Sequence, residues 1–240
     1  MAVAAVTLDA AGTLFEVAEP VGVTYARLAA RHGLRLEAAE VERRFREAFA
    51  AAPPLAFPQG SASPRADERA WWYAIVRVAF GRTGEASGFD TCFAEIFRHY
   101  AEPRAWRVFS DVPNALSRLR QLGLRVAVVS NFDERLVGLV AGLGLTPLVD
   151  LVLPSSRAGA AKPDPAIFRA ALAGLGVTPG AGVHVGDDPI ADVAGARAAG
   201  LQPVLIDRAG RLPPLRPDVP RIAALSDLPP LVPRLLDSVR

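Results

Sequence analysis

The chain has a single lysine, Lys162, which is followed by Pro163, Asp164 and Pro165. Lysine and arginine together number 27, so 26 of these basic residues are arginine. A chain that uses arginine almost everywhere else keeps lysine where an ammonium group is needed. An ammonium is a compact point charge with rotatable donors, and it can bridge two anionic groups more closely than a planar guanidinium can. Lys162 is therefore the first candidate functional residue.

Two groups of aspartates lie far from Lys162 in the sequence. Asp9 directly follows the apolar run 3–8, and Asp187 closely follows the run 182–185. Both runs are typical of buried strands, and each delivers a carboxylate to its carboxyl end. Open parallel α/β sheets bind their ligands at that end. We therefore expect Asp9 and Asp187 to lie in one site, with Asp192 nearby.

A third apolar run fits the same rule. Residues 124–129 are predicted to form a strand that ends directly before Ser130 and Asn131. A hydroxyl and an amide would then join the carboxylates at one edge of the sheet.

Composition indicates one chain with a substantial core and excludes several function classes. The chain has 240 residues, of which 51% are hydrophobic, and nothing in it resembles a membrane-length apolar span. The formal net charge is +2 with both signs interspersed, which gives little support for a nucleic-acid partner. Cys92 has no second cysteine to pair with, and no signal-peptide pattern is present. We expect a cytoplasmic protein with a small-molecule substrate; its oligomeric state is left open.

Apolar periodicity divides the chain into two patterns. Between residues 17 and 102 the apolar residues recur at helical spacing and predict a four-helix insertion. The four stripes begin at Val21, Val41, Trp72 and Phe89.

After Trp106 helices and strands alternate. Asp111 is predicted to cap a helix that reaches Gly123. Further strands are predicted near 148–153, 182–185 and 203–206, followed by a short final strand at 222–225 and a helix at 231–236. The prediction is an α/β fold with a doubly wound parallel sheet. Residues 1–15 and 106–240 would form the sheet domain, and residues 16–105 an inserted α-helical domain.

Four segments, taken in order, resemble the haloacid dehalogenase (HAD) superfamily over essentially the whole chain. They are Asp9 to Leu14, Val129 to Asn131, Lys162 to Pro165 and Gly186 to Asp192. The resemblance implies a Rossmann-like core with a mobile helical cap of the family's first type. It also implies a nucleophilic Asp9, Mg²⁺ held by Asp9, the Ala11 carbonyl and Asp187, and contacts of Ser130 and Lys162 with the transferring group.

These residue types suit phosphoryl transfer. A carboxylate can attack a phosphoryl group only if a cation and directed donors offset the charge repulsion. Asp9 would form an aspartyl-phosphate that water then hydrolyses. Gly12, Thr13 and Asn131 are assigned to substrate binding, through turn amides and side-chain groups. Asp192 could orient Lys162 or a water ligand of the metal, or it could lie on a solvated helix surface.

One position departs from the family's phosphatases. They carry a second aspartate two residues after the nucleophile, where this chain has Ala11. General acid and base help is typically worth ~10²–10⁴-fold, so unactivated phosphate esters should be poor substrates. Three readings remain: a phosphatase for substrates with acidic leaving groups, an enzyme of other chemistry, or a non-catalytic phosphate-binding protein.

The other chemistry is carbon-halogen or carbon-phosphorus cleavage. Haloacid dehalogenases resemble this chain in the first two motifs, but they need no metal and lack the Asp187-Asp188 pair. They also carry a tyrosine where this chain has Phe168. Phosphonoacetaldehyde hydrolases require a cap lysine, and the single lysine here lies in the core motif. A Mg²⁺-dependent hydrolase acting on a small phosphorylated metabolite is the preferred interpretation.

Several conspicuous residues have structural interpretations. We assign Trp72 to the core of the helical insertion, and Trp71 and Tyr73 to the lining of a substrate pocket. His184 is interpreted as a hydrogen-bonded core histidine. The expected N-caps are Asp133 and Asp188, each for the helix that follows it. Asp188 could alternatively help to position the metal.

Overall fold

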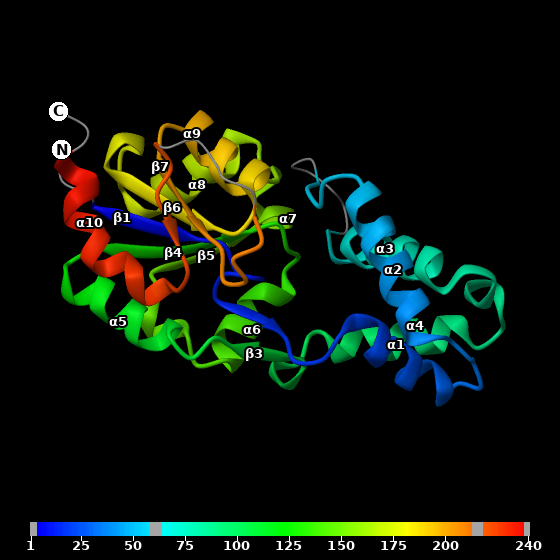
Figure 1. Ribbon diagram of the computed structural model, residues 1–240. Coiled ribbons are helices and arrows are strands. Elements are labelled where there is room, and N and C mark those ends of the chain that lie inside the picture. Colours follow the sequence, from blue (N-terminus) through cyan, green and yellow to red (C-terminus); the bar gives the residue numbers. More distant parts are fainter. Residues whose placement is uncertain (1–3, 58–63, 213–217, 238–240) are drawn as a thin grey trace.

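The computed structural model describes residues 4–57, 64–212 and 218–237. Figure 1 shows an α/β part that contains the main sheet and, beside it, a group of helices from the first half of the chain. The two parts are joined through the segments that hold two short strands, β2 (Phe15–Val17) and β3 (Trp106–Val108).

The main sheet has six strands, all parallel, in the order β5-β4-β1-β6-β7-β8. The strands are β1 (Ala5–Leu8), β4 (Arg125–Ser130), β5 (Leu151–Pro154), β6 (Gly182–Gly186), β7 (Gln202–Ile206) and β8 (Arg221–Ile222). This confirms the predicted α/β fold with a doubly wound parallel sheet.

The strand order fixes where a ligand can bind. From β1 the chain builds outward through β4 and β5, and it then returns to place β6 on the other side of β1. The order therefore reverses between β1 and β6, and open α/β sheets bind ligands in the crevice at such a switch point. Both aspartate-bearing strands border it.

Helices cover both faces of this sheet (Figure 1). One face packs on α5 (Val112–Gln121), α6 (Arg135–Gly142) and α10 (Leu228–Asp237), and the other on α8 (Pro165–Leu175) and α9 (Gly195–Ala198). Alternate strand residues supply the two layers: Val6 and Leu8 join the first, and Ala5 joins the second. Burial on both faces explains why these strands read as continuous apolar runs.

The predicted four helices of the insertion are present. They are α1 (Val21–Ala30), α2 (Ala38–Ala51), α3 (Pro64–Phe80) and α4 (Phe89–His99), and they pack around a separate hydrophobic cluster that includes Tyr25, Phe80, Phe89 and Phe93. Cys92 is buried within this cluster. Within the described ranges, no helix combines the length and apolar character needed to cross a membrane.

Strands β2 and β3 pair antiparallel, with Phe15 opposite Val108 and Val17 opposite Trp106. Both proposed domain boundaries, after residue 15 and before residue 106, lie in this ribbon. The rings of Phe15 and Trp106 meet edge to face with centroids 5.3 Å apart. The division into a sheet domain and a cap domain stays a prediction.

Remaining helical segments are short. They are α7 (Ser155–Ala158), the π-helical segment Pro189–Ala194, and the 3₁₀ segments Gly81–Glu85, Pro103–Ala105, Thr146–Leu148, Pro179–Ala181 and Leu225–Asp227. Two of them occupy parts of predicted strands. The strand predicted near 148–153 begins only at Leu151, after the turn at 146–148. The final strand, predicted at 222–225, ends at Ile222, and a turn begins at Leu225.

One predicted helix cap is wrong. Asp111 stands at the start of α5 but makes no capping hydrogen bond; its carboxylate instead accepts hydrogen bonds from Arg208 (3.0 Å) and from the backbone N-H of Leu225 (2.5 Å). Asp133 lies just before α6, and its carboxylate accepts the backbone N-H of Arg135, the first residue of that helix, at 2.9 Å, in agreement with the predicted capping role. Long-range partners take only the Asp111 carboxylate away from its helix.

Leu119 offers a test of the packing on the sheet. Leu119→Ala should lower the free energy of unfolding by ~2–5 kcal/mol, because the side chain is fully buried in the layer under the sheet. Leu122→Ala is the matched control, since Leu122 is 53% exposed just beyond the same helix. Urea unfolding measures both variants; equal losses would contradict this assignment of the core.

Candidate active site

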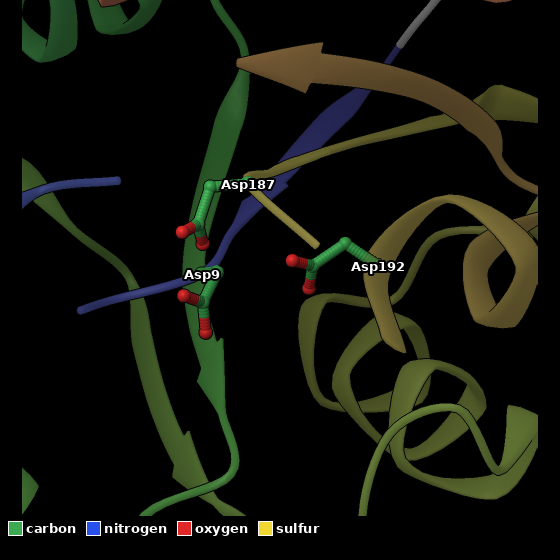
Figure 2. A group of neighbouring side chains, drawn as sticks. All are labelled: Asp9, Asp187 and Asp192. Carbon is green, nitrogen blue, oxygen red and sulfur yellow. The ribbon is translucent and has the colours of Figure 1, made fainter. Parts of the chain in front are cut away.

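Three carboxylates meet at the switch point of the sheet. Asp9 follows β1 and Asp187 follows the neighbouring strand β6, as the sequence predicts. One carboxylate oxygen of each, together with one of Asp192, lies within 4.8 Å of the others. Figure 2 shows the Asp192 carboxylate directed toward the other two.

Lys162 joins two of these carboxylates. Its Nζ donates to Asp9 Oδ1 and to Asp192 Oδ1, each at 2.5 Å, and its side chain is only 3% exposed. The predicted contact between Lys162 and Asp9 is therefore present. Asp192 is buried and orients the lysine, so the solvated-surface interpretation of Asp192 is wrong.

Asp192 is itself held from three sides. Its Oδ1 also lies 3.0 Å from His184 Nε2, and its Oδ2 accepts the backbone N-H of Asp188 at 2.9 Å. His184 Nδ1 lies 2.8 Å from Thr7 Oγ1 in the adjacent strand, where the two residues are register partners. His184 is thus a hydrogen-bonded core histidine, as predicted, and it also supports the site.

Asp188 has the capping role that the sequence predicts. Its side chain accepts the backbone N-H groups of Ile190 and Ala191 at 2.7 and 2.8 Å. These bonds fix the turn that returns Asp192 toward the sheet.

The main chain of Lys162 is positioned by Asn131. The Asn131 amide donates to the Lys162 carbonyl at 2.8 Å and accepts from the Lys162 N-H at 2.7 Å. The sequence predicts a substrate contact for Asn131, whereas both polar groups of its side chain are used by this pairing. The pairing links the end of β4 to the lysine segment and so sets where Nζ can reach.

The turn after Asp9 requires glycine at position 12. Gly12 has φ +84°, and a Cβ there would collide with the Asp187 carboxylate. The Gly12 and Thr13 amides already donate to the Phe15 and Ala10 carbonyls, at 2.8 and 3.3 Å. Their predicted binding of substrate oxygens stays a prediction, as do the substrate contacts of Ser130.

Burial shapes the electrostatics of the cluster. It raises the pKa of Asp9 despite Lys162, and it raises the pKa of Asp187 to about 7, with Asp9 and Asp192 adding to the rise. Burial also opposes ionisation of Asp192, but Lys162 and His184 outweigh it and hold the Asp192 pKa well below its usual range. Burial lowers the His184 pKa. The site therefore holds carboxylates that repel one another.

This donor set fits a hard divalent cation. Asp9 and Asp187 offer carboxylate oxygens, which Mg²⁺ prefers, while both oxygens of Asp192 already have partners. None of the hydrogen bonds that hold the described turn after Asp9 uses the Ala11 carbonyl. Asp9, the Ala11 carbonyl and Asp187 remain the candidate ligands, as in the sequence-based prediction.

A cavity of about 520 Å³ connects this cluster to the helical part. Asp9, Lys162 and Asp187 line one end of it, and aromatic residues from the helices line the other. Trp72 packs against the core of the helical part, as predicted, and it also lines the cavity. Trp71 and Tyr73 do not line the cavity, so their assignment to the pocket is wrong. Trp71 Nε1 instead donates to the Pro53 carbonyl and the Tyr73 hydroxyl to Asp90.

Comparison with known proteins identifies the family. A sequence model of the haloacid dehalogenase-like hydrolases matches residues 3–200. The chain is 36% identical over 232 residues to haloacid dehalogenase-like hydrolase domain-containing protein 3 of Homo sapiens, covering 95% of this chain and 92% of that protein. The chain therefore belongs to the haloacid dehalogenase-like hydrolases.

Two phosphatases are among its relatives. A phosphoserine phosphatase of Thermus thermophilus is 36% identical over 151 residues, which cover 61% of this chain and 56% of that protein. The crystal structure of a HAD phosphatase from Thermococcus onnurineus is 26% identical, with a TM-score of 0.66, over 95% of this chain and 97% of that chain.

The raised pKa of Asp187 predicts that ionisation of this carboxylate lowers the stability of the metal-free protein as the pH rises. Its folded-state pKa of about 7 exceeds the ordinary 3.8, so the metal-free folded protein binds more protons than the unfolded chain between these values. This contribution to stability is present below pH 4 and is lost as the pH rises through 7. Metal-free Asp187→Asn should therefore gain stability over the wild type at pH 8 and show no gain from this source below pH 4.

At pH 8, Mg²⁺ should make the wild type more stable than Asp187→Asn, which reverses the order expected without metal. At 100 times its Kd, a ligand of the folded state adds about 2.7 kcal/mol to the free energy of unfolding. We expect that increase in the wild type and little of it in Asp187→Asn. Equal stabilisation of both proteins in thermal unfolding would exclude Asp187 as a ligand.

Proposed function

We propose that this hydrolase is a Mg²⁺-dependent phosphatase of a small phosphorylated metabolite, with Asp9 as nucleophile. Residues 1–15 and 106–240 are assigned to its core domain and residues 16–105 to a cap over the site. The crowding of Asp187 against Asp9 is the observation that favours this function most, because a buried carboxylate beside a half-buried one is best explained if both serve as ligands of a cation.

The residues of the site have distinct roles in this mechanism. The Asp9 carboxylate attacks phosphorus in line, the bond to the leaving oxygen breaks, and water then hydrolyses the aspartyl-phosphate. Lys162 balances charge beside the attacking oxygen, and Ser130 at the end of β4 donates to the transferring group. Mg²⁺, when bound, would offset the negative charge that Asp9 and the phosphoryl group bring together.

Asp192 and Asn131 act through Lys162 and not on the substrate. Asp192 fixes the direction of the ammonium, and Asn131 fixes the main chain that carries it. A lysine restricted in this way needs little rearrangement as charge develops on the phosphoryl oxygens.

The test is a metal-dependent screen of phosphorylated metabolites, acyl phosphates included, with chloride release from 2-chloropropionate measured in parallel. We expect phosphate release with Mg²⁺, its loss in the presence of a chelator, and no turnover by Asp9→Asn. Chloride release that survives chelation would favour the dehalogenase alternative. Phe168 argues against the dehalogenase alternative. Haloacid dehalogenases carry a tyrosine at this position, whereas the Phe168 ring packs on His184, with centroids 4.8 Å apart, and has no hydroxyl.

Ala11 leads to a separate prediction about leaving groups. Because no carboxylic acid follows Asp9 at this position, the rate should depend steeply on leaving-group acidity, with sugar phosphates slow. Ala11→Asp should raise alkyl phosphatase activity by up to ~10²-fold and change acyl phosphate turnover much less.

Steady-state kinetics on both substrate classes measure this difference. Ordinary rates of the wild type on alkyl phosphates would show that another group supplies the proton. Mg²⁺-dependent phosphate binding without turnover in either protein would favour a non-catalytic role.

A further inference from the structure

We propose that the substrate is an aryl phosphate, the phosphate monoester of a phenolic hydroxyl, with its ring in the helical end of the cavity. This inference rests on the proposed phosphatase function and narrows its substrate class. It comes from the cavity wall that faces the catalytic carboxylates.

Aromatic side chains dominate that wall. They include Tyr25, Phe45, Phe49, Trp72, Phe93 and Phe97. The rings of Tyr25, Phe45, Phe49 and Trp72 form a continuous series, with successive centroids 5.7, 5.8 and 5.9 Å apart. Such a surface favours a flat apolar group, which gains both burial and ring contacts.

The charged groups on this wall are already paired. Arg135 donates to Asp133 at 2.6 Å and to the Phe97 carbonyl at 2.9 Å, and Glu16 pairs with Arg107 at 2.6 Å. Trp72 Nε1 also donates to Asp133, at 2.6 Å. In the described part of the chain, the wall therefore offers no unpaired counter-charge to a second charged group of the substrate, which an amino acid phosphate would require.

One hydroxyl on the wall is free to bind a substrate. Among the described residues, the Tyr25 hydroxyl has no hydrogen-bond partner, and Tyr25 lines the cavity. The Tyr100 oxygen is enclosed by protein and is not offered to a ligand. The Tyr25 hydroxyl can pair with one polar substituent of a ring. A sugar would leave several hydroxyls without partners in the same space, which is unfavourable.

Ala11 requires the same kind of leaving group independently. When Asp9 attacks phosphorus, the bond between phosphorus and the phenolic oxygen breaks and the electron pair leaves with the oxygen. A phenolate is stable enough to depart before water protonates it, whereas an alkoxide needs an acid at position 11. Water then cleaves the aspartyl-phosphate, so that an aryl phosphate and water give a phenol and inorganic phosphate. The cavity and the missing acid thus both favour the same class of substrate, the aryl phosphates.

The experiment compares kcat/KM of the wild-type protein with Mg²⁺ on 2-naphthyl phosphate, phenyl phosphate, acetyl phosphate and glucose 6-phosphate. The two aryl esters have leaving groups of similar acidity, so the second ring tests the cavity alone. We expect 2-naphthyl phosphate to exceed phenyl phosphate by about 10-fold or more. Both should exceed acetyl phosphate, although its leaving group is more acidic.

A cavity variant tests where the ring binds. Phe49→Ala should lower the ratio of kcat/KM for naphthyl over phenyl phosphate by several-fold, because Phe49 lines the cavity and contacts Trp72. Val78→Ala is the control, since Val78 is 61% exposed on α3 and lies outside the cavity. Thermal unfolding checks that both variants fold; an unchanged ratio in folded Phe49→Ala would overturn the placement of the ring.

Failure of this inference differs from failure of the proposed function. If acetyl phosphate matches or exceeds the aryl esters, the phosphatase assignment stands and the aryl assignment is overturned. If no phosphate is released from any compound, the phosphatase assignment fails. Calorimetry with naphthylmethylphosphonate and methylphosphonate then tests whether the cavity binds an aromatic ring. Tighter binding of the aromatic compound, with a negative heat-capacity change, supports this placement of the ring, and equal affinities overturn it.

Discussion

The buried ammonium of Lys162 is the group on which the rest of the site depends. It lies between Asp9 and Asp192, and without it two buried carboxylates would face each other uncompensated. If all three aspartates are ionised they carry −3, and Lys162 reduces this to −2, which is the charge that one divalent cation offsets. Burial favours neutral His184, so the histidine adds no charge to this balance. Lysine and metal would therefore complement each other: the lysine fixes Asp192 and one oxygen of Asp9, and the cation would take the side that faces Asp187.

The same short loop serves both ends of the cavity. Ser130 ends strand β4 beside the catalytic carboxylates, Asn131 follows it directly, and Asp133 and Arg135 come within five residues of Ser130. Asp133 is fully buried and receives Trp72 from α3, while Arg135 reaches the Phe97 carbonyl on α4 and stacks over its ring at 3.9 Å. Movement of the helices away from the sheet would have to break these contacts, including the hydrogen bond from Trp72 Nε1 to the Asp133 carboxylate. The position of the aromatic wall is thus tied to the loop that carries Ser130.

The sequence predicted the elements well because their signals are local. Apolar runs over 3–8 and 182–185 predict buried strands, and the strands observed are Ala5–Leu8 and Gly182–Gly186; helical stripes likewise predict α1 to α4. The partners of polar residues could not be read in this way. Asp111 looks like a helix cap, yet Arg208, distant in sequence, takes its carboxylate. Asp133 does cap α6 through the Arg135 N-H, but its second partner, Trp72 Nε1, follows from no local pattern. Trp71, Trp72 and Tyr73 are adjacent, and only the packing of α3 decides which of them meets the cavity. The support of Asp192 by His184 was also missed, although the strand pairing of Thr7 with His184 places that imidazole beside the site.

Ala11 and the aromatic wall are best understood together. A site built around Asp9, Lys162 and a cation stabilises attack on phosphorus but does nothing for the departing oxygen, so the leaving group must be stable by its own chemistry. The cavity supplies the complementary selection, because an apolar wall with paired charges admits an aromatic ring and disfavours a polyhydroxylated one. An aspartate in place of Ala11 would bring another carboxylate to the cavity that holds Asp187, whose pKa is raised to about 7 by burial and by the neighbouring Asp9 and Asp192. Alanine at this position avoids that added charge and restricts the substrates to those whose leaving group departs without an acid.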